Sequence, residues 1–394
     1  MRPAFAVDAG GAFTEFAVLQ EAPADRPVLR PHHLAIGLYT WAEGALRRTH
    51  QVEVDIAGAR TDVPELAGLA QPDLVLLNDG DLDYAIIRFD DRSMATLTAS
   101  IGAIADSLAR AVCWSAVLDM ALQGQLPARR LVRMLTASMG GETSASVLQS
   151  LLDRTRQLMT QMPDPAWLAE CQNELARAAG RLLRAAKPGS DRQLAWAQLL
   201  SWTAVTAEQL DTLAGLLDGS AASDGLAVDA ELRWALLQRL AATGRAGDAE
   251  IDAELDRDGT DEGRRLALAC RAAIPDDAHK AEAWRLLAES DELGADGIGQ
   301  VARGFGQPEH ARLLGPYADR YFAALPAIWS SRTDVIRVYL GKVLFPYTAA
   351  SPALLAQIDA FLAAQRRDPG LARVVIEGRD VVTKTLRARA LPSE

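Results

Sequence analysis

Histidine, cysteine and long apolar runs are scarce in this chain, and each shortage excludes a class of function. Five histidines occur in 394 residues, and none forms the His-Glu-x-x-His pattern of zinc hydrolases. Cys113, Cys171 and Cys270 lie far apart with no Cys-x-x-Cys spacing, so we expect buried free thiols in a reducing, cytoplasmic setting. No run approaches the roughly 20 apolar residues of a membrane span, and no signal peptide is expected.

Catalytic motifs of other kinds are missing as well. The sequence has no Gly-x-Ser-x-Gly elbow, and neither Gly10-Gly11 nor Gly140-Gly141 is followed by the Lys-Ser or Lys-Thr of a phosphate loop. An acidic run over residues 252–262 lacks the full spacing of a calcium loop and indicates a solvated loop. The net charge of −11 argues against nucleic acid or an anionic membrane as partner. We therefore expect no catalytic residue and no bound metal in this chain.

Residues 1–90 have the pattern of a small β-sandwich. Val52, Val54 and Ile56 alternate with polar residues, which is the period of a strand with one buried face. Turn signals such as Glu43-Gly44 recur every 8–12 residues, and six or seven short strands are predicted. The stretch 73–91, DLVLLNDGDLDYAIIRFDD, is predicted to be the last hairpin, with its turn at Asp79-Gly80.

From residue 91 to residue 394 the apolar period becomes helical. Asp90, Asp91 or Ser93 can cap the first helix, and short joints containing Gly, Pro, Asp or Ser separate the helices that follow. Roughly thirteen to sixteen helices are expected. Short joints imply antiparallel neighbours, so the sequence predicts a large all-α domain built as an irregular α-solenoid of HEAT or armadillo type. A ligand or partner is expected on its concave face.

One cationic group near the C-terminus is a candidate binding site. Arg332, Arg337 and Lys342 lie close in sequence to several aromatic residues. One interpretation is a surface helix in which Asp334 pairs with Arg337. The other is a basic site for a carboxylate such as a peptide C-terminus, because arginine offers bidentate hydrogen bonds to a carboxylate.

The order of several short motifs resembles a known family. The junction contains Asn78, Tyr84 and Asp90, followed by Arg110, Asp119, Gly124 and Glu142-Thr143. Farther along come Phe305, Gln307, Tyr317, Tyr321-Phe322, Trp329, Arg332 and Phe345-Pro346. In this order they resemble the sandwich and ERAP1-like C-terminal helical domain of M1 zinc aminopeptidases, closest to the bacterial aminopeptidase N group. The resemblance covers essentially the whole chain.

The resemblance implies a fragment of an enzyme or a naturally split protein. The zinc motif and the Gly-Ala-Met-Glu-Asn loop of that family belong to a catalytic domain that is missing from this sequence, so the chain alone is expected to be inactive. By resemblance, zinc belongs to the parent's catalytic domain, the partners are that domain and peptide substrates, and the helical domain caps the active site and positions peptides. The alternative is a free-standing α-solenoid scaffold that binds a protein partner.

Overall fold

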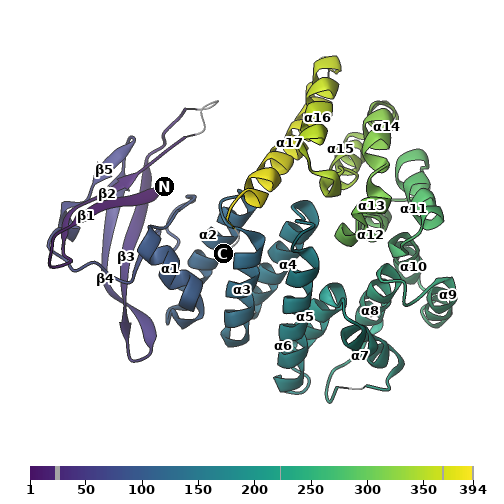
Figure 1. Cartoon of the computed structure of the whole chain (residues 1–394), viewed down its shortest axis with the longest axis horizontal. Coiled ribbons are helices and arrows are strands. Elements are labelled where there is room, and N and C mark those ends of the chain that lie inside the picture. Colours follow the sequence, from purple (N-terminus) through teal and green to yellow (C-terminus); the bar gives the residue numbers. More distant parts are fainter. Residues whose placement is uncertain (23–26, 222, 366–367, 393–394) are drawn as a thin grey trace. The chain divides into compact units, whose positions relative to one another are not determined.

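The computed structural model describes residues 1–22, 27–221, 223–365 and 368–392 (Figure 1). Its N-terminal part is a small β-sandwich of two three-stranded antiparallel sheets, with strand orders β1-β2-β5 and β4-β3-β6. The strands are β1 (Arg2–Val7), β2 (Phe13–Leu19), β3 (His32–Ala42), β4 (Ala45–Ile56), β5 (Arg60–Asp62) and β6 (Leu74–Leu77). Six strands in the described residues agree with the number expected from the turn spacing.

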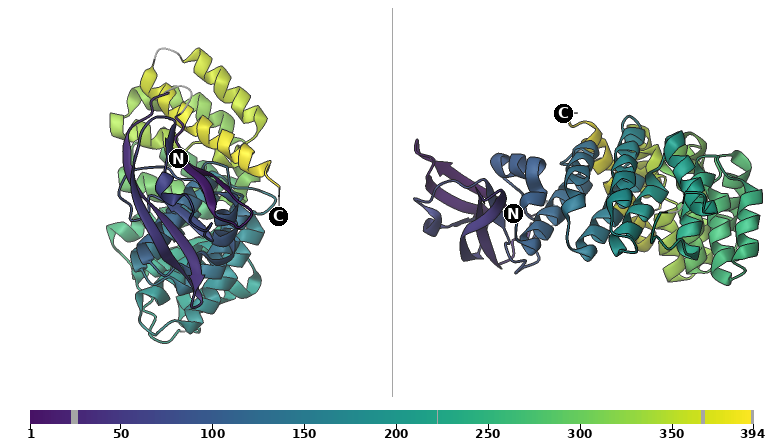
Figure 2. Two further views of the ribbon diagram at one scale, coloured as in Figure 1. Left: turned by 90° about the vertical axis from the view of Figure 1, so that its left-hand side faces the viewer. Right: turned by 90° about the horizontal axis from the view of Figure 1, so that it is seen from below.

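The long β3–β4 hairpin forms as its turn residues predict. Its two long strands are among the purple strands in Figure 2. Glu43 and Gly44 both have positive φ, which is the requirement of a two-residue hairpin turn. Strand β4 keeps the predicted alternation, with Glu53 exposed and Ile56 buried. Strand β3 lies between β4 and β6, and its residues 34–39 are buried on both faces.

The predicted hairpin over residues 73–91 is wrong in its second half. Residues 74–77 form β6 on β3, but the chain does not return along β6. Asn78, Gly80 and Asp81 all have positive φ, and the side chain of Asn78 binds the backbone of Asp83, which closes a compact turn. The following extended segment meets Met1 instead: the Met1 amino group donates to the Ile86 carbonyl at 2.5 Å.

Helices follow from residue 91, as predicted. The described residues contain seventeen α-helices, one more than the upper end of the thirteen to sixteen expected. They are α1 (Asp91–Ser100), α2 (Ser107–Leu122), α3 (Ala128–Ser138), α4 (Ala145–Gln161), α5 (Leu168–Ala185), α6 (Asp191–Thr203), α7 (Ala207–Asp218), α8 (Ala230–Ala242), α9 (Asp248–Arg257), α10 (Asp261–Ala273), α11 (Asp277–Trp284), α12 (Ala295–Phe305), α13 (Ala311–Leu314), α14 (Tyr317–Ser331), α15 (Asp334–Val343), α16 (Pro352–Ala364) and α17 (Pro369–Arg389).

Side-chain caps fix where many of these helices begin. The Asp90 carboxylate accepts from the Ser93 amide, so Asp90 is the cap of α1 among the three candidates. Thr206 and Gln209 form a reciprocal capping box at α7. Pro352 and Pro369 occupy first-turn positions, where a missing N–H costs nothing. Local sequence therefore determines these boundaries before any packing is considered.

Contacts within the chain define two compact units. Residues 1–126 and 133–151 form the first, called here the N-terminal unit, and residues 127–132 together with those from 152 onward form the second, called the helical unit. Secondary structure changes at Asp91, but α1 packs on β6, and Ser93 accepts the Val75 amide at 2.8 Å within the first unit. The expected domains 1–90 and 91–394 stay a prediction.

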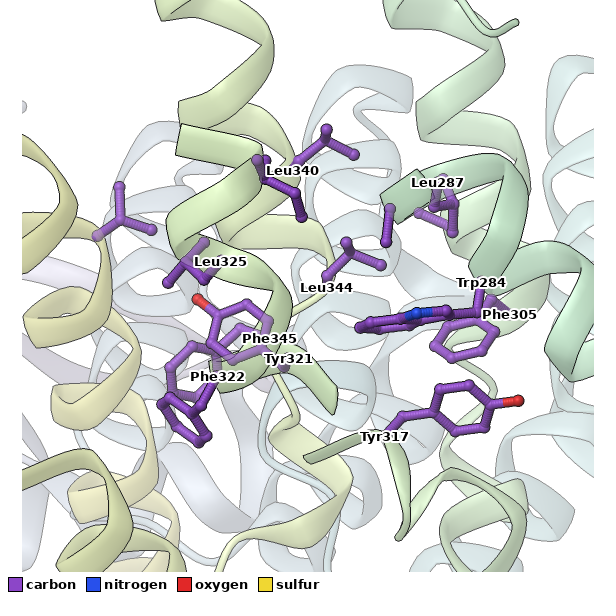
Figure 3. Packing of buried hydrophobic residues seen from close by; sticks show 14 of the residues in the cluster. Trp284, Leu287, Phe305, Tyr317, Tyr321, Phe322, Leu325, Leu340, Leu344 and Phe345 are labelled. Atoms are coloured by element: carbon purple, nitrogen blue, oxygen red, sulfur yellow. The ribbon is translucent and has the colours of Figure 1, made fainter. Parts of the chain in front are cut away.

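The helical unit has a large aromatic core (Figure 3). Trp284, Phe305 and Tyr317 contact one another, and the rings of Phe305 and Tyr317 meet edge to face with centroids 5.0 Å apart. Tyr321 is buried and donates to the Gly341 carbonyl at 2.8 Å. Helix α10 packs on both α8 and α12, and α17 packs on α15 and α16. Whether this helix stack is a solenoid stays a prediction.

A completely buried lysine joins two of these helices. The ammonium group of Lys280 donates to the carbonyls of Ala272, Gly304 and Phe305, at 2.6, 3.4 and 3.2 Å. These carbonyls belong to the last turns of α10 and α12, where backbone acceptors lack helical partners and the helix dipole favours a cation. Burial lowers the pKa of Lys280 to about 7.

The end of the helical unit is fastened to its beginning. The guanidinium of Arg389, in the last turn of α17, donates to the carbonyl of Pro163, just after α4. It also donates to the Ala350 carbonyl at 2.8 Å. Through the described residues, no helix combines the length and the apolar character that crossing a membrane requires.

Candidate functional site: a charged pocket in the helical unit

The helical unit contains a pocket of about 860 Å³, lined entirely by its own residues. This volume lies within the roughly 300–1,000 Å³ typical of ligand sites. Helices α4, α8, α10, α12, α15 and α17 contribute to the wall, together with Trp202 from the end of α6. Four of the lining side chains are cationic, namely Arg156, Arg239, Arg303 and Lys342.

Arg156 is the unusual member of this group. Its guanidinium lies 5.8 Å from the centre of the Trp202 ring, and no carboxylate of the described residues is within ion-pair distance. Burial, followed by the like charges of Arg303 and Arg239, lowers the pKa of Arg156 to about 10. The charge of Asp153 offsets part of this effect, and an anion bound here would add to that compensation.

The other two arginines of the pocket differ in how they are satisfied. Arg239 is buried, forms an ion pair with Glu309 and donates to the Ala204 carbonyl at 2.7 Å. Arg303 is exposed and donates only to the amide oxygen of Gln300, at 2.6 Å, within the described part of the chain. Arg303 therefore resembles Arg156: each guanidinium faces the pocket, and neither has a carboxylate partner in the described residues.

The α15 side of the pocket is formed by Tyr339 and Lys342. A Cβ atom at Gly299 would collide with the Tyr339 hydroxyl, so glycine on α12 is what allows this ring to lie against the helix. Lys342 is half exposed and pairs with Glu377 at 2.8 Å. Hydrogen bonds from Lys342 and then Arg373 lower the pKa of Glu377. The wall thus combines an aromatic ring, a half-exposed ion pair and the two arginines described above.

Of the three cations predicted from the sequence, the structure places only Lys342 in this pocket. Arg332 pairs with Asp291 and donates to the Ser290 carbonyl at 2.6 Å. Arg337 pairs with Asp334 at 3.0 Å and lies over the Trp329 ring. Both guanidiniums are therefore already engaged, and the predicted pair of Asp334 with Arg337 is present. Their role in binding a carboxylate stays a prediction.

Sequence reasoning missed Arg156, Arg303 and Trp202. Arg156 and Trp202 lie outside the family motifs, and Arg303 lies two residues before Phe305. The three meet only through the tertiary packing of α4, α6 and α12. The available signal was indirect, since arginine on the apolar side of a helix is unusual.

No set of side chains in the described residues is suited to zinc. No group of three or more His, Cys, Asp or Glu residues there could hold a metal ion. His32 and His33 each bind a different carboxylate, Asp83 and Asp55, at 2.8 Å. His310 is buried just before α13, where it donates to the Ala242 carbonyl at 2.8 Å. These residues do not fit the zinc that the family resemblance implies for a catalytic domain, and no chemical step in this chain is assigned to a metal.

The cysteines also lack the features of a reactive site. In the described residues they are free and buried. Burial raises the pKa of the Cys113 and Cys270 thiols, and it raises that of Cys171 to about 12. None has the lowered pKa of a catalytic nucleophile.

The residues that carried the family resemblance have structural roles at the junction. Arg110 forms a bidentate ion pair with Glu142, at 2.9 and 3.1 Å, and both side chains are almost fully buried. Asp119 pairs with Arg88 at 2.9 Å. Burial alone would raise the pKa of Glu142, but the bonds from Arg110 and the Ser144 amide outweigh it, and this pKa lies below its usual value. The ion pairs of Arg110 and Asp119 therefore stabilise the fold, whereas other motif residues line the pocket, namely Phe305, Gln307, Tyr317, Phe345 and Pro346.

The described residues thus form a sandwich and a helical unit with a charged pocket, and they contain no metal-binding cluster. Comparison with known proteins names the family. Residues 74–384 match the ERAP1-like C-terminal domain, and the chain belongs to this family, the C-terminal part of M1 aminopeptidases. The chain is also 42% identical over 397 residues to aminopeptidase N of Streptomyces lividans.

The match to that relative is unequal in coverage. It includes 99% of this chain but 46% of the relative, so the chain spans about half the length of the aminopeptidase. The sequence-based resemblance is confirmed at the level of the family.

Proposed function

We propose that this chain is the non-catalytic C-terminal portion of a zinc aminopeptidase, in which the helical unit holds the distal part of a peptide while a separate catalytic domain removes its N-terminal residue. The observation that carries the proposal is the pocket in a chain of this family: two of its guanidiniums, Arg156 and Arg303, have no ion-pair partner among the described residues although the walls also carry carboxylates, and its volume suits a peptide segment. Zinc would belong to the catalytic domain, and the protein would work in the cytoplasm.

The chemistry of the pocket favours the end of a peptide. A free C-terminal carboxylate is an anion that Arg156 and Arg303 could bind with charge-assisted hydrogen bonds. Lys342 can join them by leaving Glu377, because this pair is exposed and therefore weak. The predicted contribution of Arg332 and Arg337 would require each to exchange its present carboxylate. The work of the pocket is positioning, which improves the encounter of substrate and catalytic groups without making or breaking a bond.

The experiment uses a chimera of Streptomyces lividans aminopeptidase N in which this chain replaces the matched 46%. The chain alone is expected to hydrolyse no alanyl or leucyl chromogenic amide, and the chimera is expected to hydrolyse both. Arg156→Gln with Arg303→Gln should lower kcat/KM of the chimera for a nonapeptide about 10–100-fold, since a bond to a charged group contributes about 1.5–3 kcal/mol. The chromogenic amide, which is too short to reach the pocket, should be hydrolysed at an unchanged rate.

Arg332→Gln with Arg337→Gln is the matched control, since these arginines line no part of the pocket. An equal loss for the nonapeptide and the short amide in the pocket variant would contradict peptide positioning. An inactive chimera, or metal-dependent hydrolysis by the chain alone, would overturn the proposed function. If the chimera is inactive, a scaffold that binds a protein partner becomes the better explanation.

A further inference from the structure

Three apolar side chains project from one side of the extended segment that follows β6. Leu82 is 50% exposed, Tyr84 98% and Ile86 57%. Alternate residues of an extended chain point to opposite sides, so these three share the outward side while Asp83 and Ile87 point inward. Single exposed apolar residues are ordinary, but three in succession on one side of one segment form a stripe, called here the apolar stripe.

The segment is held firmly although its outward side has no cover. The Asp83 carboxylate accepts from His32 at 2.8 Å and from the His33 amide at 3.2 Å, and the Asn78 side chain accepts the Asp83 amide. Ile87 is buried in the N-terminal unit. The tyrosine is thus presented on a fixed backbone, which lowers the entropy lost when a partner covers it. A fixed aromatic residue between aliphatic neighbours is the usual composition of an interface centre.

The first residue of the chain lies directly against this segment. The Met1 amino group donates to the Ile86 carbonyl at 2.5 Å, and the Arg88 amide donates to the Met1 carbonyl at 2.8 Å. The Streptomyces relative has more than half of its length outside the matched region, and the matched family is a C-terminal domain. In such a relative, chain that precedes the equivalent of Met1 would leave beside the stripe. A preceding domain would therefore be tethered next to it at high effective concentration.

We propose that Leu82, Tyr84 and Ile86 form the docking surface for the catalytic portion of the aminopeptidase. The inference rests on the proposed function, because it names the surface by which the two portions meet. The neighbouring carboxylates are already engaged: Asp81 accepts from the Asn78 side chain at 3.3 Å, and Asp90 caps α1. The apolar centre suits a partner surface with an apolar pocket. Tyr84 is expected to be the main anchor, since it is the largest and most exposed of the three.

The test measures burial of the stripe directly, by the rate at which a maleimide labels Tyr84→Cys. The native thiols of Cys113, Cys171 and Cys270 are buried and provide a silent background. In the 394-residue chain the introduced thiol should react rapidly. In the chimera with the Streptomyces catalytic portion it should react at least about tenfold more slowly, as expected for a site reached only by local opening. Leu82→Cys and Ile86→Cys should show a smaller protection.

Val335→Cys is the matched control, because Val335 is 74% exposed on α15 of the helical unit. Its labelling rate should be the same in the chain and in the chimera. Equal labelling of Tyr84→Cys in both proteins would overturn the docking surface. Protection of Tyr84→Cys in a chimera without activity would support the surface while the proposed function fails. Full activity of the chimera without protection of Tyr84→Cys would support the proposed function and overturn the docking surface. The two failures are therefore distinguishable.

A second variant tests the energetic side of the same proposal. Tyr84→Ser should leave the Tm of the isolated chain unchanged, because the side chain contacts almost nothing there. In the chimera it should weaken the association of the two portions about 30-fold, as is typical of an interface anchor, and lower the Tm of the first transition. The same small effect in both proteins would count against Tyr84 as an anchor.

Discussion

Arginines at two places in this molecule are in opposite situations. In the N-terminal unit, Arg110 has a bidentate carboxylate partner in Glu142 and belongs to the motifs that mark the family. In the helical unit, Arg156 has an indole ring beside it and no carboxylate of the described residues within ion-pair distance. A charge that is paired and buried fixes a fold, whereas a charge kept without a partner at a pocket wall leaves an opening for an anion. One arginine therefore stabilises the N-terminal unit, and the other has no ion-pair partner among the described residues.

The strongest test of this contrast removes the partner of the paired arginine. Glu142→Gln should lower the free energy of unfolding of the N-terminal unit by about 3–5 kcal/mol, because it leaves Arg110 charged and buried without its carboxylate. Urea unfolding followed by circular dichroism measures this change. Glu21→Gln, which removes the exposed partner of Arg2, is the control and should cost less than about 1 kcal/mol. A similar small cost for both would mean that the buried pair is not a structural requirement.

Acid should have the same effect as this substitution. The pKa of Glu142 is below its usual value in the folded chain, so the stabilisation from its ionised form is complete above the unfolded-state pKa of about 4.3. It is lost as the pH falls through the lower folded-state pKa. In the Glu142→Gln variant this part of the acid dependence should be absent, and an unchanged acid profile would contradict the assignment.

Lys280 is a third buried cation, satisfied by carbonyls instead of a carboxylate. Its pKa of about 7 in the folded chain is below the value of about 10.4 expected in the unfolded chain, so unfolding takes up a proton between these pH values. The wild-type chain should therefore gain up to about 4 kcal/mol of stability between pH 7 and pH 10 relative to Lys280→Met. Chemical denaturation of both proteins across this range measures the difference. A constant difference would show that Lys280 keeps its charge throughout.

Loss of the unpartnered arginine should cost the least stability of the three. Arg156→Gln is expected to change the free energy of unfolding by less than about 0.5 kcal/mol, or to raise it, because it removes a desolvated and repelled charge. Binding of a free-acid nonapeptide to the chain should nevertheless weaken about tenfold, as titration calorimetry would measure. The C-terminally amidated peptide should bind equally to both proteins. A large loss of stability would indicate that Arg156 is structural in the same way as Arg110.

The thiols should show the smallest difference between the two units. Cys113 belongs to the N-terminal unit, and Cys171 and Cys270 belong to the helical unit. Burial raises all three pKa values, so a colorimetric disulfide reagent should react with none of them in the native chain and with all of them in denaturant. Rapid native reaction of one thiol would identify the unit that opens more readily.

Much of the architecture follows from local patterns. Period-two alternation in residues 51–56, the Glu43-Gly44 turn and the Asp90 cap each predict what is observed, because each depends on neighbours in sequence. The segment 81–90 shows why such reasoning failed elsewhere. It alternates like a strand and is extended, but left-handed residues at the turn direct it to Met1, a partner 85 residues away in sequence. Alternation predicts an extended chain without saying which strand it meets.

The site was less predictable for a related reason. Arg332, Arg337 and Lys342 were candidates because they are close in sequence. Arg332, however, pairs with Asp291, which only folding brings near, and Arg337 pairs with Asp334 on its own helix. Arg156 and Arg303 are distant in sequence and come together in one wall of the pocket. Proximity along the chain indicates a local surface, and a pocket between several helices is a property of their packing.

The attachment of Arg389 to Pro163 and Ala350 has a consequence for how the helical unit unfolds. A stack of helix pairs with two open ends can fray stepwise from either end, since each pair contacts only its neighbours. Here Arg389 of α17 is bonded to Pro163 in the loop after α4, so neither end of the helical unit can unfold without breaking this attachment. Loss of the last turn of α17 would free both ends at once, and a single cooperative transition would become a gradual one.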